Sequence, residues 1–149
     1  MADASQTAAP GARDVNPRAH REPAVARTLG LTFTHLSRDR IAAELPARGE
    51  LANRKNILSG GVLMALADIL GGTAASANLP PGAGTTTIES KTNFFAPVEL
   101  GDTVFAECTP LHRGRTTMVW QTRITRSDGK LVAIVTQTQL VMTGARSRE

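Results

Sequence analysis

The longest apolar stretch of the chain predicts one helix that the other elements must cover. From Gly60 to about Asn78 almost every residue is apolar or small, on every face of the helix. A helix that is apolar all round is normally a core helix. The following segment 79–82 contains two prolines and a glycine, which end a helix. The pattern therefore predicts a central helix over about 60–78.

The segments on either side of that helix alternate as β-strands do. After it, strands are predicted over 85–95, 103–111, 116–125 and 131–142, and Asp128-Gly129 predicts a tight hairpin turn. Before it, 31–36 and 41–45 predict another hairpin, and 46–58 has the irregular polarity of a loop. One helix covered on all sides needs a strongly curved antiparallel sheet, so the fold class predicted is α+β.

The two ends of the chain carry weaker patterns. Residues 1–16 are small and polar without periodicity, which predicts a disordered tail. A short helix is predicted from Pro17 to about Leu29, capped by Asn16 and ended by Gly30. Residues 144–149 are expected to be frayed. One domain over 17–143 is long enough to bury a proper core.

Composition narrows the class of protein. The sequence is 41% apolar and 20% charged, as in soluble globular proteins. Its net charge is +4, but basic residues are scattered among acids and aromatics make up only 3%, which disfavours nucleic-acid binding. The single Cys108 excludes an internal disulfide and is expected to be buried on a strand. The three histidines are dispersed, so no metal site is predicted.

The sequence also bears on location. The chain shows no signal-like apolar run near its start, which predicts a cytoplasmic protein. The central helix is nearly long enough to cross a bilayer, but its glycines and its acid make it a poor membrane segment. No membrane association is expected.

The central helix carries the first candidate for chemistry. Asp68 is the only charged residue between Gly60 and Ala77. Burying a carboxylate in such a helix is costly unless it is paired, so Asp68 indicates a carboxylate-based site. The alternative is a structural acid satisfied by Arg, Ser or backbone groups, because only some perturbed acids are functional.

Gly60 and Gly61 stand where this helix begins. The first N–H groups of a helix lack internal partners and carry the positive end of its dipole. Glycine lets a ligand approach them, as stabilisation of an oxyanion requires; tight helix–sheet packing is the alternative explanation. Asp68 follows Gly60 by eight residues, about 12 Å along a helix. If the two act on one small group, one of them comes from a second subunit.

Ser59 precedes the glycines and is predicted to be the helix N-cap. It is not expected to be a nucleophile, because His20, His35 and His112 lie in the tail or on strands and offer no base.

Four strings carry a family resemblance. LSGGVLMALAD, TTIESKTNFFAP, PLHRGRTTMVWQTRI and DGKLVAIVTQTQLVM closely resemble hotdog-fold acyl-CoA thioesterases, nearest to the phenylacetate-pathway-like branch of the 4-hydroxybenzoyl-CoA thioesterase superfamily. The resemblance covers roughly residues 27–142. It implies a long helix wrapped by five to six strands, and an acyl-CoA substrate with no separate cofactor. It also implies a homodimer or dimer of dimers, with active sites between subunits.

The resemblance assigns roles by position. Asp68 would attack the thioester or activate water, Gly60 would polarise the carbonyl through its N–H, and Asn53 would orient the water or the acid. Ser59 and Gly61 would lie beside the substrate. The family usually has His where this chain has Ser59, which affects rate and substrate range, because a hydroxyl cannot act as imidazole does near neutral pH.

Weaker candidates and rival functions complete the expectation. Thr87 matches a hydroxyl that assists the acid in some relatives, or is simply a β-former. Arg113 and Arg115 could bind the phosphates of coenzyme A, or could simply be solvent-exposed residues of a hairpin turn. One rival function is a hotdog enoyl-thioester hydratase, which relies on a His that this helix lacks. The other is an acyl-CoA-binding or sensing module with little or no turnover.

Overall fold

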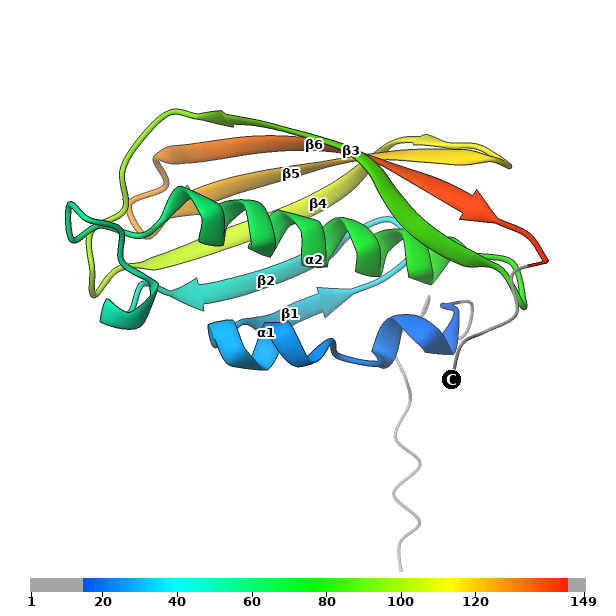
Figure 1. The fold of residues 1–149 in the computed structure, drawn as a ribbon, viewed down its shortest axis with the longest axis horizontal. Coiled ribbons are helices and arrows are strands. Elements are labelled where there is room, and N and C mark those ends of the chain that lie inside the picture. Colours follow the sequence, from blue (N-terminus) through cyan, green and yellow to red (C-terminus); the bar gives the residue numbers. More distant parts are fainter. Residues whose placement is uncertain (1–14, 145–149) are drawn as a thin grey trace, which may run out of the picture.

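A single long helix lies across a six-stranded antiparallel sheet (Figure 1). The computed structural model describes residues 15–144. The sheet order is β1-β2-β4-β5-β6-β3. The helix is α2 (Gly60–Asn78), and the strands are β1 (Thr32–Leu36), β2 (Ile41–Pro46), β3 (Gly84–Phe94), β4 (Thr103–Arg113), β5 (Thr117–Arg126) and β6 (Leu131–Met142). The predicted α+β class, the central helix and the strand-rich second half are confirmed.

The core lies between α2 and the inner face of the sheet. Leu66, Leu70 and Ala74 on the helix are fully buried, as are Val104 and Cys108 on β4. Small helix residues let the sheet approach closely, and close packing is what stabilises an interior. Burial raises the pKa of the Cys108 thiol to about 11, so it stays protonated near neutral pH and is no nucleophile.

Part of the opposite side of α2 has no cover within the described residues. Gly61, Met64 and Asp68 are exposed along it. The expectation that this helix is buried on every face, with Asp68 inside, is therefore wrong for the single chain. The sheet covers only one side of α2, and a helix whose other side awaits a partner has the same sequence pattern as a core helix.

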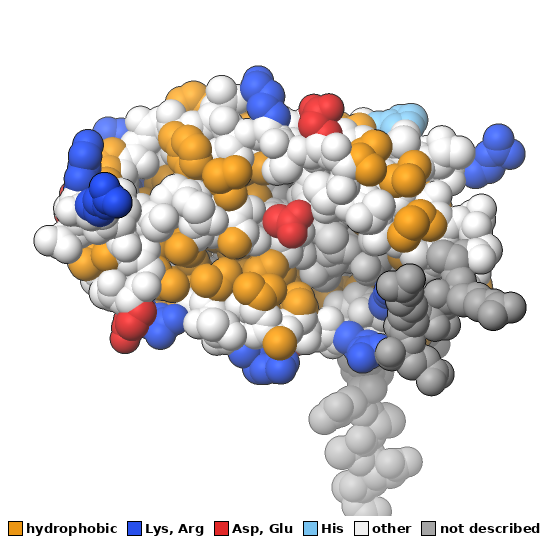
Figure 2. Space-filling view, in the orientation of Figure 1, with side chains coloured by type: hydrophobic (Ala, Val, Ile, Leu, Met, Phe, Trp, Pro, Cys, Tyr) orange, Lys and Arg blue, Asp and Glu red, His pale blue; other side chains and the backbone are white. Residues whose placement is uncertain are grey.

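The edge strand β3 continues this uncovered face. Ile88, Phe94 and Phe95 are each more than half exposed. Figure 2 shows hydrophobic side chains spread over this side of the molecule. The helix is long and apolar enough to cross a membrane by length and composition, but 56% of that window is buried against the rest of the fold.

The N-terminal segment differs from its prediction. The expected helix over 17–29 is two pieces, a 3-10 helix η2 (Pro17–His20) and a short helix α1 (Ala24–Leu29). Pro23 separates them, because the residue before a proline is pushed out of the helical region. Gly30 ends α1 with a φ of +79°, as predicted.

The predicted tail ends earlier than expected. Val15 is buried, and Asn16 donates through its backbone N–H to Ala77 O (3.3 Å) and through its side chain to Leu79 O (3.1 Å). The same side chain caps η2 by accepting from the Arg18 N–H. Residues 15 and 16 therefore belong to the domain. The rest of the predicted tail, and the predicted frayed end beyond residue 144, lie outside the described residues.

Candidate active site

Asp68 lies in the middle of α2 and faces the neighbouring strands β3 and β6. Its Oδ1 accepts a hydrogen bond from Gln137 Nε2 (2.7 Å) and another from Thr87 Oγ1 (3.1 Å). Its Oδ2 has no hydrogen-bond partner among residues 15–144. The carboxylate is therefore held by one oxygen, and the other is free to meet a substrate or a water molecule.

Thr87 is the centre of the network behind the acid. Its Oγ1 accepts from Gln137 Nε2 (2.9 Å) and from Gln139 Nε2 (2.7 Å). Because a hydroxyl has one proton, that proton points to Asp68. The contact between Thr87 and the acid is thus present, and its role in assisting the acid stays a prediction. Both glutamines are about 1% exposed and were missed by the sequence reasoning.

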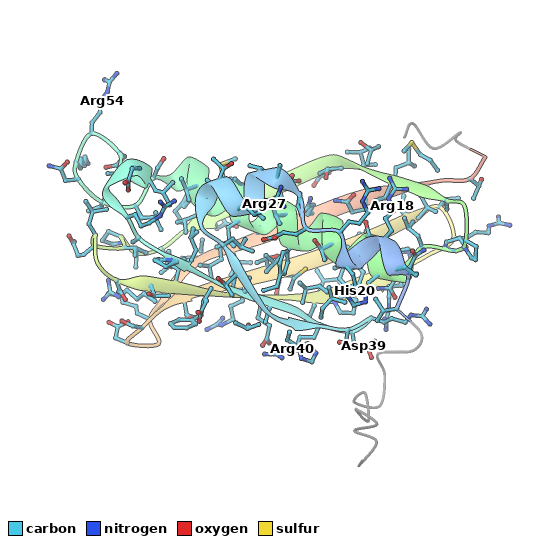
Figure 3. All side chains as sticks on the ribbon, turned by 90° about the horizontal axis from the view of Figure 1, so that it is seen from below. Arg18, His20, Arg27, Asp39, Arg40 and Arg54 are labelled. Carbon is cyan, nitrogen blue, oxygen red and sulfur yellow. The ribbon has the colours of Figure 1, made fainter. Side chains whose placement is uncertain are left out.

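A cavity of about 590 Å³ opens beside Asp68. Its walls are rich in hydroxyl groups, and two arginines of the N-terminal segment line it. Figure 3 shows this segment, with Arg18 labelled, lying along α2. The polar side chains lining the cavity are Arg18, Arg21, Asp68, Thr73, Ser76, Thr85, Thr86, Thr87 and Gln139. The two arginines give this cavity the charge expected for an anionic ligand.

Gly60 lies at a second, smaller hollow of about 330 Å³. Asn53 and the aromatic rings of Phe94 and Phe95 also line it. Among the described residues, neither Gly60 nor Gly61 donates its backbone N–H to an acceptor. A Cβ on Gly60 would lie 3.2 Å from the Phe94 ring, so tight packing also favours glycine here.

Ser59 holds the N-cap position, but its side chain does not cap the helix. Only its carbonyl does so, by accepting from the N–H groups of Val62 and Leu63. The prediction of a side-chain cap is therefore wrong, since the hydroxyl makes no such hydrogen bond. Ser59 is half-buried and does not line the hollow that contains Gly60.

Asn53 shapes its own loop. Its Oδ1 accepts from the backbone N–H groups of Lys55 (2.8 Å) and Ile57 (3.4 Å). Such side-chain bonds to nearby backbone are typical of Asn in turns. Asn53 shares the smaller hollow with Gly60 and makes no hydrogen bond to Asp68.

The two hollows share no lining residue. One contains Asp68 and Thr87, and the other contains Asn53 and Gly60. Within one chain the predicted catalytic residues therefore form two separate groups. This agrees with the spacing of about 12 Å along the helix estimated for Gly60 and Asp68.

The two arginines predicted to bind phosphate lie elsewhere. Arg113 Nη1 donates to Arg38 O (3.1 Å), Asp39 Oδ1 (2.7 Å) and Asn78 Oδ1 (3.3 Å), which ties the end of β4 to the first hairpin. Arg115 is exposed in the β4–β5 turn. Neither lines the Asp68 cavity. Phosphate binding by this pair stays a prediction.

Possible metal ligands are also dispersed. Within residues 15–144 no three His, Cys, Asp or Glu side chains gather closely enough to hold a metal ion.

One acid-bearing helix laid across a six-stranded antiparallel sheet is the hotdog arrangement. The comparisons with known proteins supply the reaction. The sequence profile of the thioesterase superfamily matches residues 55–133. The chain belongs to that superfamily and is a thioester hydrolase.

Individual relatives agree with this assignment. The chain is 30% identical to the proofreading thioesterase EntH of Klebsiella pneumoniae, over 75% of this chain and 81% of that protein. A solved Haemophilus influenzae thioesterase is 28% identical, with a TM-score of 0.78 over 90% of this chain and 92% of its own. The E. coli PaaI protein, at 23% identity over 87% of this chain and 93% of its own, has a TM-score of 0.79 and supports the fold.

Proposed function

We propose that this protein is an acyl-CoA thioesterase that works as a homodimer, with Asp68 of one subunit and Gly60 of the other meeting at one thioester. The observation that carries the proposal is the hydrogen bonding of the Asp68 carboxylate. One carboxylate oxygen is held by two donors and the other is free beside a cavity of about 590 Å³. A fixed carboxylate with one free oxygen is what general-base or nucleophilic catalysis needs.

The reaction uses groups from both hollows. In one route, Asp68 Oδ2 takes a proton from a water molecule while that water attacks the carbonyl carbon. In the other, Asp68 Oδ2 attacks the carbonyl carbon itself and forms an anhydride, which water then hydrolyses. The Gly60 N–H stabilises the oxyanion, and donors of this kind contribute about 3–4 kcal/mol in other enzymes. Collapse of the tetrahedral intermediate breaks the C–S bond, and the thiolate leaves and takes up a proton. Asn53, beside Gly60, would orient the water or the acid.

The uncovered face supports the homodimer. Strand β3 is an 11-residue edge strand, and exposed Ile88, Phe94 and Met64 lie on it or beside it on α2. Exposed edge strands and exposed large apolar side chains are normally covered, because they otherwise invite aggregation. A second copy related by a two-fold axis would cover this face and bring its own Gly60 hollow to the neighbouring Asp68.

The lining of the larger cavity supports a coenzyme A thioester. Arg18 and Arg21 provide two guanidinium groups on its wall, and Thr85 and Thr86 provide hydroxyls. Phosphate is bound by arginine through charge-assisted hydrogen bonds. A cytoplasmic location, where the sequence placed the protein, is part of this proposal.

The decisive experiment is release of thiol from a panel of aryl-, short- and long-chain acyl-CoAs, followed with a thiol-trapping reagent. Asp68→Ala and Asp68→Asn are expected to abolish release, and undiminished release by either variant would refute the assignment. Tight acyl-CoA binding by the wild type without turnover would favour the sensing module instead. Loss of enoyl-thioester absorbance without thiol release would favour the hydratase.

A further inference from the structure

We propose that Gln137 is a positioning residue that fixes the carboxylate of Asp68, and that Gln139 supports it one step behind, through Thr87. The proposal rests on the function proposed above and extends it to two β6 residues. Gln139 lines the cavity, but an amide serves neither as an acid nor as a nucleophile near neutral pH. The two glutamines act instead by holding the residue that does.

The first argument is the direct contact between Gln137 and the acid. Gln137 is about 1% exposed, and its Nε2 lies 2.7 Å from Asp68 Oδ1 and 2.9 Å from Thr87 Oγ1. The amide nitrogen carries two protons and can only donate. Both protons are therefore used on the acid and on its hydroxyl partner. Hydrogen bonds to a charged group are the stronger kind.

The second argument is the order of donors behind Thr87. Gln139 Nε2 donates to Thr87 Oγ1 (2.7 Å), and Gln139 Oε1 lies 3.0 Å from Thr85 Oγ1, whose single proton is shared between that oxygen and Leu140 O (3.1 Å). Thr87 Oγ1 then accepts from both glutamines, and its single proton is left for Asp68. The hydrogen bonds through Thr87 therefore run from the two glutamines toward the acid and end on Asp68 Oδ1.

The third argument is energetic. Gln137 Oε1 is buried and has no hydrogen-bond partner among the described residues, and neither has the indole N–H of Trp120, its neighbour across β5 and β6. An unsatisfied buried polar atom costs about 1–3 kcal/mol. An apolar side chain of the same length would avoid that cost. Stability therefore does not explain glutamine at this position, whereas its hold on Asp68 does.

The helix makes room for this arrangement. Gly71 lies on the buried side of α2, and a Cβ placed on it would collide with Gln137 Oε1. A glycine within a helix is unfavourable by roughly 0.5–1 kcal/mol relative to alanine. Gly71 thus allows the Gln137 amide to reach between the helix and the sheet to Asp68.

This network determines which carboxylate oxygen of Asp68 takes part in the reaction. Two donors occupy Oδ1, so the carboxylate cannot rotate freely and Oδ2 faces the substrate. Misplacing a catalytic group by about 1 Å can cost roughly 100-fold in rate. Removing Gln137 should therefore lower kcat while leaving substrate binding almost unchanged.

Gln137→Met tests this directly, because methionine keeps the length and removes both donors. The expected result is a kcat lower by about 10- to 100-fold, a KM within about twofold of wild type, and an unchanged or higher Tm. The matched control is Gln121→Met on the half-exposed side of β5, which should behave as wild type. A kcat within twofold of wild type, or a fall that Gln121→Met reproduces, overturns the proposal.

A double-mutant cycle tests the order of the network. Gln139→Met alone should lower kcat by about 3- to 10-fold, and it should have no further effect in a Thr87→Val background, because Gln139 acts through that hydroxyl. Gln137→Met should still lower kcat in the same background, since it reaches Asp68 directly. Full additivity of Gln139→Met and Thr87→Val contradicts the proposed order.

A third measurement does not depend on turnover. The side-chain amide resonances of Gln137 and Gln121 are followed by NMR in the wild type and in Asp68→Ala. Removing the acceptor should shift the Gln137 resonances and leave those of Gln121 in place. Unmoved Gln137 resonances would overturn the positioning role even in an active thioesterase. A clear shift in a protein that releases no thiol would instead count against the proposed function.

Discussion

Gly71→Ala tests how closely the helix, the amide and the acid depend on one another. On an exposed helix face this substitution would stabilise the protein by up to about 1 kcal/mol. Here the added methyl group would collide with Gln137 Oε1, and overpacking of this kind costs about 1–3 kcal/mol. We therefore expect a net loss of about 0–2 kcal/mol of unfolding free energy. We also expect a kcat reduced about as far as in Gln137→Met, because the displaced amide no longer reaches Asp68.

Thermal unfolding and thiol release measured on the same preparations check this prediction. Gly72→Ala is the stability control, because a Cβ on the adjacent Gly72 meets no atom within 4 Å. The double variant Gly71→Ala with Gln137→Ala removes the collision and should recover stability without recovering kcat. If Gly71→Ala raised the Tm and kept full kcat, the reasoning about the Gln137 amide would be refuted.

Three further predictions concern other groups. Cys108 should resist iodoacetamide at pH 8 in the folded protein and react only on unfolding, because burial raises its pKa to about 11; rapid native-state labelling would contradict this. Hydrogen bonds from Arg126 lower the pKa of Asp128 to about 2, so the stabilisation from this pair is present above pH 4 and lost toward pH 2. In Asp128→Asn, the free energy of unfolding should not show this loss between pH 4 and pH 2. Arg18→Gln with Arg21→Gln should raise KM for acyl-CoA but not for the matching N-acetylcysteamine thioester; equal effects on both would exclude a role in phosphate binding.

The sequence predicted the frame of the molecule well. The central helix was expected over about 60–78 and runs from Gly60 to Asn78, and the last strand matches its predicted range of 131–142. These elements have strong periodic patterns and clear breakers. The N-terminal helix was split by Pro23, a signal that was present in the sequence and was outweighed by the favourable cap at Asn16.

The candidate site was predicted only in part. Asp68 stood out because it is the lone charge in an apolar helix. Gln137 and Gln139 also had a signal, since they share the buried face of β6 with Val135 and Val141, and polar residues at core positions need partners. The proximity of Arg18 and Arg21 to Asp68 had no such signal. It depends on how η2 docks against α2, a contact between segments 50 residues apart in the chain.

The separation of the two hollows along α2 predicts that two inactive variants can complement each other. In the proposed two-fold dimer, each chain contributes Asp68 to one active site and Gly60, at the start of α2, to the other. A protein lacking the acid (Asp68→Ala) and one lacking the amide donor (Gly60→Pro) would each be inactive alone. Refolded together in equal amounts, about half of the dimers would be mixed, and each mixed dimer would have one complete site. Two dead proteins would then give about a quarter of the wild-type activity, a complementation that a site contained within one chain cannot produce.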